Sequence, residues 1–175
     1  PTSGVQISGL PSSDGTGALA CYTLDLDLTG SGLEFCMKAD ADGFFDAPTT
    51  GDVTASIEGL YFEVVNSDGS PIQTQTLPGT EFAEFVINDA NDNELDRAEV
   101  NAYYHSNVVR DYVLQYNPTY PTIANQLGFR INTNIGQSCN AFYNGSSINF
   151  YTSGGGCSNT AFSSVVHHEY GHHLV

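Results

Sequence analysis

The spacing of apolar residues changes at Asn88, and this change predicts an α+β fold. Before it, residues 21–28 alternate between apolar and polar, which is typical of a half-buried strand. After it, the apolar residues of 95–116 recur at spacings of three and four, which indicates one long helix. We therefore expect a β-rich segment over residues 1–87 and a mixed segment of helices and edge strands over 88–175.

Turn and capping residues divide both segments further. In the first segment, additional strands are expected over residues 33–39, 53–57, 60–65 and 81–87, with the first of these forming a hairpin. Asn93 is placed to cap the long helix, and Asn117-Pro118 to end it. Later strands are expected over 129–133, 141–143 and 148–151. A final helix should begin near Asn159 or Thr160 and run to the end of the chain.

The charge of the chain excludes several partners. Twenty acidic residues face four basic ones, and the net charge is −16. Nucleic acid and anionic membrane surfaces both require a basic patch, so neither is expected to bind. No apolar run approaches the roughly 20 residues that span a bilayer. No signal peptide opens the sequence, so we expect any export signal to have been removed. An acidic surface keeps a secreted protein soluble, and the alternative is that some carboxylates bind calcium.

Two oxygen-rich stretches are the candidates for calcium, residues 40–46 and 89–93. Neither completes an EF-hand loop. In the second, Glu94 stands where glycine is required, and Glu99 is one residue short of the bidentate position. Turn formation and helix capping are the simpler interpretation of both stretches.

Four cysteines are present without a C-x-x-C pair, so a cysteine zinc site or a thioredoxin-like motif is not indicated. Three pairings are possible, and we predict the nearest neighbours, Cys21–Cys36 and Cys139–Cys157. Each loop would contribute about 3 kcal/mol of stability. Disulfides would place the protein outside the cytosol. The alternative is four reduced, buried thiols.

The sequence His168-Glu169-Tyr170-Gly171-His172 carries the chemistry. Two histidines four residues apart lie on one face of a helix, where both can bind one zinc ion. The carboxylate of Glu169 can then accept the proton of a metal-activated water as this water attacks a carbonyl carbon. Apolar residues on both sides predict a buried helix, which disfavours the alternative of exposed histidines on an acidic helix.

Three neighbours of the motif refine this interpretation. His167 and His173 point away from the metal-binding face, so we expect surface positions or supporting roles for both. Val175 stands where a metzincin has the glycine that turns the chain toward a third histidine. The helix should therefore continue, which favours a third ligand from a later helix, usually a glutamate.

Several motifs in order resemble the thermolysin-like zinc peptidases, a group of gluzincins. These are residues 140–146 (N-A-F-Y-N-G-S), the glycine-rich stretch that follows, and residues 165–172. The H-E-Y-G-H variant with a cysteine pair is most similar to fungalysin-like and related bacterial members. Residues 100–112 resemble the first long helix of that fold, so the match covers 88–175. The resemblance implies the N-terminal lobe of a zincin and a secreted zinc endopeptidase.

The resemblance also implies a substrate site. In the family, the strand equivalent to 140–143 lies at the rim of the cleft, and the substrate backbone pairs with it as an added strand. By position, Asn140 and Ala141 would hold the substrate backbone, and Phe142 and Tyr143 would support the wall. Tyr143 replaces the usual tryptophan.

The family's third zinc ligand, a glutamate, lies beyond Val175. The chain would thus hold two of three ligands, and two histidines leave an open, weak site. We expect the isolated chain to be inactive, either as a fragment or as one half of an enzyme that a second chain completes. The alternative from another class is a non-catalytic extracellular binding or structural module with a degenerate peptidase helix. The intact Glu169 argues against degeneration.

Overall fold

The computed structural model describes most of the chain, and its gaps fall before residue 91. The described residues are 3–8, 19–24, 33–38, 44–47, 53–59, 61–77, 82–86 and 91–175. The strands before the first helix are β1 (Ser3–Ser8), β2 (Leu19–Leu24), β3 (Leu33–Lys38), β4 (Phe44–Ala47), β5 (Val53–Ser56), β6 (Phe62–Asn66), β7 (Thr74–Leu77) and β8 (Phe82–Val86). They are followed by α1 (Glu94–Tyr116), β9 (Phe129–Ile135), β10 (Ala141–Tyr143), β11 (Ser147–Tyr151) and α2 (Ser163–Leu174).

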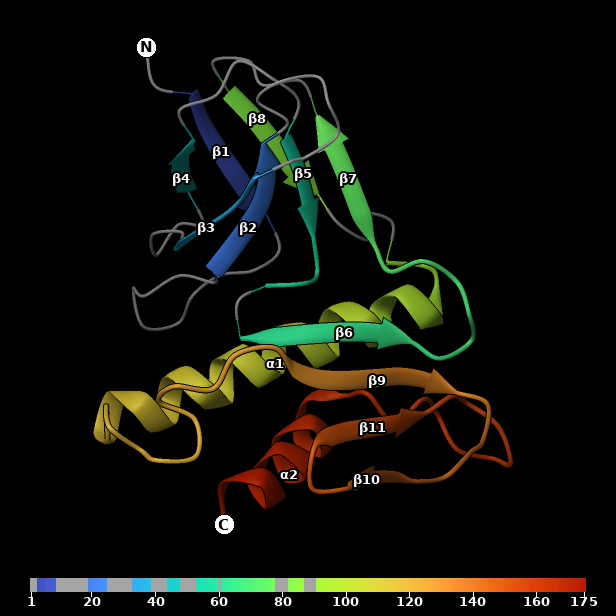
Figure 1. Ribbon diagram of the computed structural model, residues 1–175. Coiled ribbons are helices and arrows are strands. Elements are labelled where there is room, and N and C mark those ends of the chain that lie inside the picture. Colours follow the sequence, from blue (N-terminus) through green and yellow to red (C-terminus); the bar gives the residue numbers. More distant parts are fainter. Residues whose placement is uncertain are drawn as a thin grey trace.

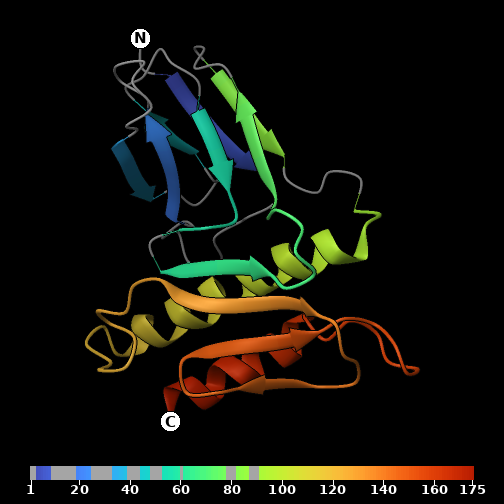
Figure 2. The same cartoon turned by 45° about the vertical axis from the view of Figure 1, so that its right-hand side comes forward.

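The second half of the molecule is a two-layer α+β unit. Its mixed sheet has the strand order β10-β11-β9-β6, in which β9 runs parallel to both neighbours and β10 runs antiparallel to β11. Helix α1 packs against β6 and β9, α2 packs against β10 and β11, and the two helices contact each other. Figures 1 and 2 show both helices on the same side of this sheet. The predicted α+β class is confirmed at this level.

The remaining strands form a separate β group, drawn above the mixed sheet in Figure 1. A three-stranded sheet has the order β4-β1-β8, and two further pairs are β2-β3 and β5-β7. The antiparallel β2-β3 pair confirms the hairpin predicted from alternation. None of the helices in the described part of the chain has the length and hydropathy needed to cross a bilayer.

Strand β6 connects the two parts. It lies between β5 and β7 in sequence, yet it pairs with β9 and not with either of them, with Val64 opposite Ile131. Burial alternates along it, and Phe62, Val64 and Asn66 are the buried positions. The β-rich segment expected over 1–87 therefore supplies the outer strand of the sheet on which the helices pack.

Helix α1 begins and ends where the sequence predicted. The side chain of Asn93 accepts a hydrogen bond from the backbone N–H of Leu95 at 3.0 Å, and this bond satisfies one of the free donors of the first turn. Asn117 follows the last helical residue, and Pro118 cannot continue the helix.

Helix α2 begins at Ser163, so the prediction of a start at Asn159 or Thr160 was wrong. Both side chains stabilise the preceding loop instead. The hydroxyl of Thr160 accepts from the backbone N–H of Tyr151 at 2.8 Å, and the Asn159 carbonyl oxygen accepts from the N–H of Ala161 at 3.0 Å. The bond to the side chain of Asn159 spans two positions, as a capping bond does, so the sequence alone does not separate the two uses at that residue. The bond between Tyr151 and Thr160 spans nine positions and depends on the fold.

Strands β1, β4 and β7 were not predicted. The polar sequence Thr74-Gln75-Thr76 of β7 has no apolar alternation, and its side chains are exposed or half-buried. Backbone hydrogen bonds to β5 hold this segment as a strand, and they cannot be predicted from its polar composition.

The core lies between the mixed sheet and the two helices. The sheet contributes Phe62, Val64, Phe129, Ile131, Ile148 and Phe150, and the helices contribute Ala98, Ala102, Tyr103, Val166 and Tyr170. All of these side chains are at most 5% exposed. Burying each large apolar side chain contributes roughly 1.5–3 kcal/mol, so this core fixes α2 against the sheet.

Candidate metal and substrate site

His168 and His172 lie on the exposed side of α2. Their Nε2 atoms are 3.1 Å apart, and their rings are nearly perpendicular at 87°. Two zinc–nitrogen bonds of about 2.1 Å at a tetrahedral angle place the nitrogens about 3.4 Å apart. The observed separation therefore fits two ligands of one zinc ion.

Glu169 and Tyr170 are the buried members of the motif, and Glu169 has 7% of its surface exposed. Within the described residues, no group donates a hydrogen bond to its carboxylate. The donor set of two imidazoles, with Glu169 adjacent in sequence to one of them, fits a catalytic zinc site, which keeps one position open. The described part of the chain brings no third His, Cys, Asp or Glu to the pair.

The strand expected to bind substrate, β10, is the edge of the mixed sheet. The N–H of Tyr151 donates to the carbonyl of Asn140 at 3.3 Å, and the N–H of Asn144 donates to the carbonyl of Ser147 at 3.2 Å. Because bonding residues alternate along an antiparallel pair, Phe142 also faces β11. The backbone groups of Ala141 and Tyr143 therefore point away from the sheet and form its free edge.

The side chains of β10 divide between the two faces of the sheet. Ala141 and Tyr143 stand opposite Phe150 and Ile148, which are buried beneath the helices, so both lie on the side of α2. Phe142 lies on the opposite face, where its ring meets Tyr151 at 5.8 Å. Of the two residues expected to support the cleft wall, Tyr143 is on the side of α2 and Phe142 is not.

Asn140 precedes the strand, and its side chain is exposed. Its carbonyl also accepts a hydrogen bond from the hydroxyl of Thr160 at 3.0 Å. The backbone of Asn140 is thus fixed to the loop before α2.

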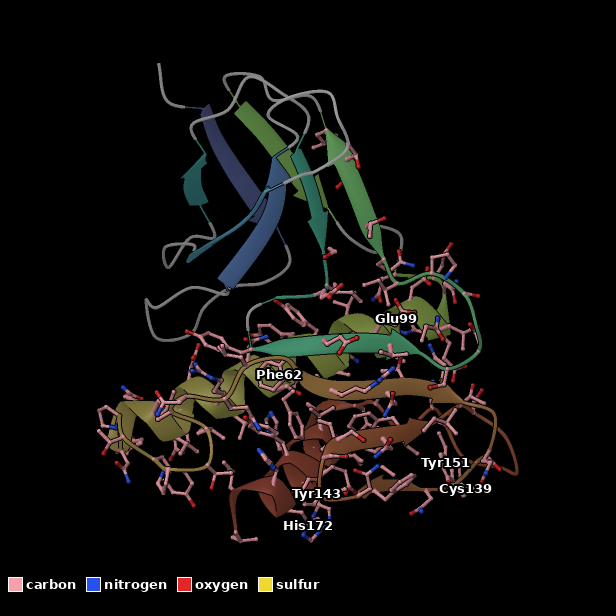
Figure 3. The ribbon with its side chains drawn as sticks, viewed as in Figure 1. Phe62, Glu99, Cys139, Tyr143, Tyr151 and His172 are labelled. Carbon is pink, nitrogen blue, oxygen red and sulfur yellow. A yellow bond between two sulfur atoms is a disulfide. The ribbon has the colours of Figure 1, made fainter. Side chains whose placement is uncertain are left out.

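His167 and His173 contact other elements, as their positions on the helix predicted. The ring of His167 meets His105 of α1 at 5.2 Å, and burial lowers the pKa of both rings. His173 faces the sheet, where its ring stacks on Phe129 at 4.3 Å and its Nδ1 lies 3.1 Å from the hydroxyl of Tyr143. Burial also lowers the pKa of His173. Figure 3 shows Tyr143 and His172 at the same end of the molecule. Apart from the repeated histidines, no sequence pattern indicates the contact between Tyr143 and His173.

Cys139 and Cys157 form a disulfide that joins the start of β10 to the loop before α2. Cys21 and Cys36 stand directly opposite each other in the β2-β3 pair. Opposed residues of antiparallel strands lie about 4.5–5.5 Å apart, within the range that a disulfide spans. The side chains of that second pair lie outside the described residues, so its bond stays a prediction.

The acidic stretch before α1 has structural uses. Asn93 caps the helix, and the carbonyl of Asn91 accepts from the guanidinium of Arg97 at 3.1 Å. Glu99 is fully buried, where it accepts hydrogen bonds from Asn66 and from the backbone N–H of Gln73. Residues 89 and 90 lie outside the described residues.

The other calcium candidate divides between β4 and undescribed chain. Residues 44–46 belong to β4, and residues 40–43 lie outside the described residues.

Comparison of the sequence with protein-family models and with curated proteins finds no match.

Proposed function

We propose that this chain forms the N-terminal lobe of a secreted, thermolysin-like zinc endopeptidase. The observation that carries the proposal is the pair of Nε2 atoms, 3.1 Å apart on α2, with Glu169, a residue only 7% exposed, next to His168 in the sequence. The free edge of β10 on the side of the same helix supports it. The disulfide between Cys139 and Cys157 supports an extracellular location.

His168 and His172 hold the zinc in this proposal. When bound, zinc supplies Lewis-acid polarisation of the scissile carbonyl and activates water at neutral pH. Glu169 accepts a proton from the attacking water and passes it to the leaving amine. Its position between the two histidines in sequence, with a carboxylate free of protein donors, leaves it able to serve both steps.

The edge strand orients the substrate. An extended peptide adds to β10 through the outward backbone groups of Ala141 and Tyr143, as in other cases of β-augmentation. Backbone pairing is indifferent to side-chain identity, so this strand gives binding energy and register. Side-chain preference would come from the rest of the cleft.

A catalytic zinc site has three protein ligands, and we propose that a glutamate outside this chain supplies the third. That glutamate would belong to the C-terminal half of the enzyme, in the same polypeptide or in a separate one. The isolated chain should accordingly bind zinc weakly and hydrolyse no peptide. Calcium stays a second cofactor candidate, for which the acidic stretches are the only support.

The proposal is tested by separating metal binding from hydrolysis. Cobalt or zinc titration of this chain should show one site that His172→Ala removes and Glu169→Gln retains. In the longer protein, Glu169→Gln should lower peptide hydrolysis by about 10²–10⁴-fold. His167→Ala is the matched control, since that histidine faces α1 and should leave metal binding intact.

Wild-type hydrolysis by a Glu169→Gln protein that retains its zinc would exclude this mechanism. Metal binding without any Glu169-dependent rate would instead favour the second candidate, a non-catalytic extracellular module with a degenerate peptidase helix.

A further inference from the structure

His173 follows His172 in the sequence, and its ring points into the molecule. It is held by residues from two other parts of the fold. The ring stacks on Phe129 of β9 with an interplanar angle of 28°, and Nε2 lies 2.6 Å from the side-chain nitrogen of Gln126. Its remaining nitrogen, Nδ1, lies 3.1 Å from the hydroxyl of Tyr143 on β10.

The hydrogen-bond network assigns the direction of each bond. The hydroxyl of Tyr170 donates to the side-chain oxygen of Gln126 at 3.3 Å, which leaves the Gln126 nitrogen to donate to His173. Nε2 of His173 is then an acceptor, so Nδ1 carries the proton and donates to Tyr143. Within the described residues, the Tyr143 hydroxyl has no other partner.

The edge strand depends on such a link because β10 has three residues and, among the strands that the structure describes, pairs with β11 alone. Short edge strands held by few hydrogen bonds open locally at low cost in free energy. The hydrogen bond from His173 to Tyr143 attaches β10 to α2 in addition to its pairing with β11. His173 is the residue next to a proposed metal ligand, His172.

We propose that His173 is a positioning residue that fixes the substrate-binding strand β10 relative to the helix carrying His168 and His172. Through Tyr143, it sets the distance between the outward backbone groups of β10 and the metal. The claim about strand position stands on the contacts alone, and the claim about substrate rests on the proposed function.

Amide hydrogen exchange on this chain, without metal, tests the strand claim. Phe142 and Asn144 direct their N–H groups toward β11 and report on the attachment of β10. Tyr143→Phe removes only the hydroxyl, and His173→Phe retains the stacked ring but removes both nitrogens. Each should lower protection at these two amides about fivefold, the effect of losing one ordinary hydrogen bond.

The double substitution should lower protection no further than His173→Phe alone, because the bond that Tyr143→Phe removes is already absent from that variant. Tyr151→Phe is the matched control. It deletes a hydroxyl on the neighbouring strand for which no hydrogen bond is found among the described residues, and protection should not change. Unchanged protection in Tyr143→Phe, or effects of the two singles that multiply in the double, would overturn the proposal. Tyr143→Phe retains its ring, so it tests the bond even if His173→Phe does not fold.

Kinetics of the active, longer protein test the substrate claim. Tyr143→Phe should raise KM for a peptide about fivefold while kcat stays within about twofold, since a displaced strand weakens binding more than chemistry. Zinc affinity should be unchanged. Lower protection with an unchanged KM overturns the substrate claim alone. An inactive wild-type protein refutes the proposed function, and the exchange measurement still decides the strand claim.

Discussion

The ring of Tyr170 meets the ring of Phe62 edge-on, with centroids 5.4 Å apart and planes at 68°. Tyr170 lies between the two proposed zinc ligands in the sequence, and Phe62 lies on β6, in the first segment of the chain. Both are at most 1% exposed, and Phe129 contacts each of them. The orientation of the proposed zinc ligands therefore depends on a strand far from them in sequence.

Removing one ring of the contact between Phe62 and Tyr170 should destabilise the whole α+β unit. Phe62→Ala should lower the free energy of unfolding by about 3–5 kcal/mol, because it leaves a cavity beneath α2. Tyr170→Phe retains the ring and loses the bond to Gln126, so about 1 kcal/mol is expected. Leu127→Ala, at a side chain that is 62% exposed, serves as the control and should cost under about 0.5 kcal/mol. Urea unfolding measures all three, and a small effect of Phe62→Ala would contradict the packing described.

Proline substitutions should distinguish the two sides of β10. Ala141→Pro removes an N–H that points away from the sheet, so the fold should persist while peptide binding is lost. Phe142→Pro removes an N–H that bonds to β11 and should destabilise the strand itself. Thermal unfolding and NMR titration with a peptide check the two effects. Unchanged peptide binding by Ala141→Pro would show that substrate does not pair with this edge.

Stability should depend on pH through Glu99. Burial is the main cause that raises its pKa from 4.5 to about 7, despite the bonds from Gln73 and Asn66 that favour the charged form. Asp96 and Asp68 add to the rise. Because the folded pKa lies above the unfolded value, the folded state binds the proton more tightly. Protonated Glu99 therefore contributes up to about 3 kcal/mol to the free energy of unfolding. This contribution is fully present below about pH 4.5 and is lost as the pH rises through 7.

Glu99→Gln isolates this contribution. The wild-type protein should lose stability between pH 5 and pH 8 relative to the variant, as measured by urea unfolding at both pH values. The half-buried rings of His105 and His173 act in the opposite direction, since their lowered pKa values reduce stability as pH falls. They are common to both proteins and cancel in the difference. If the free energy of unfolding varied with pH in the same way in both proteins, Glu99 would not have a raised pKa in the folded state.

The disulfide between Cys139 and Cys157 should stabilise the segment that leads into β10. Cys139 and Cys157 close a loop with a sequence separation of 18, and the double substitution to serine should cost about 3 kcal/mol. The double substitution is preferable to a reductant, which would also reduce any bond between Cys21 and Cys36. Limited proteolysis should then cut between residues 139 and 157 faster than in the wild type. Equal stability of the two proteins would contradict this role.

Local features of the fold were predictable from the sequence because they depend on neighbouring residues. Asn93 caps α1 through a bond to a residue two positions away, and the spacing of His168 and His172 places both on one face of a helix. The edge strand at 141–143 and the Cys139–Cys157 pairing also agree with prediction. The start of α2 was not predicted correctly, because Asn159 and Thr160 use their side chains for a loop.

The sequence predicts the α+β class and the limits of the long helix, and it indicates which residues are candidate metal ligands. Each follows from periodicity or from hydrogen bonds over a few positions. The three-dimensional arrangement alone shows that β6 pairs with β9, that Glu99 is buried against Asn66, and that His173 contacts Tyr143. Periodicity tells which face of an element is buried but not which element covers it. That choice is made by contacts between residues far apart in the chain, whose pairing depends on how all the layers pack together.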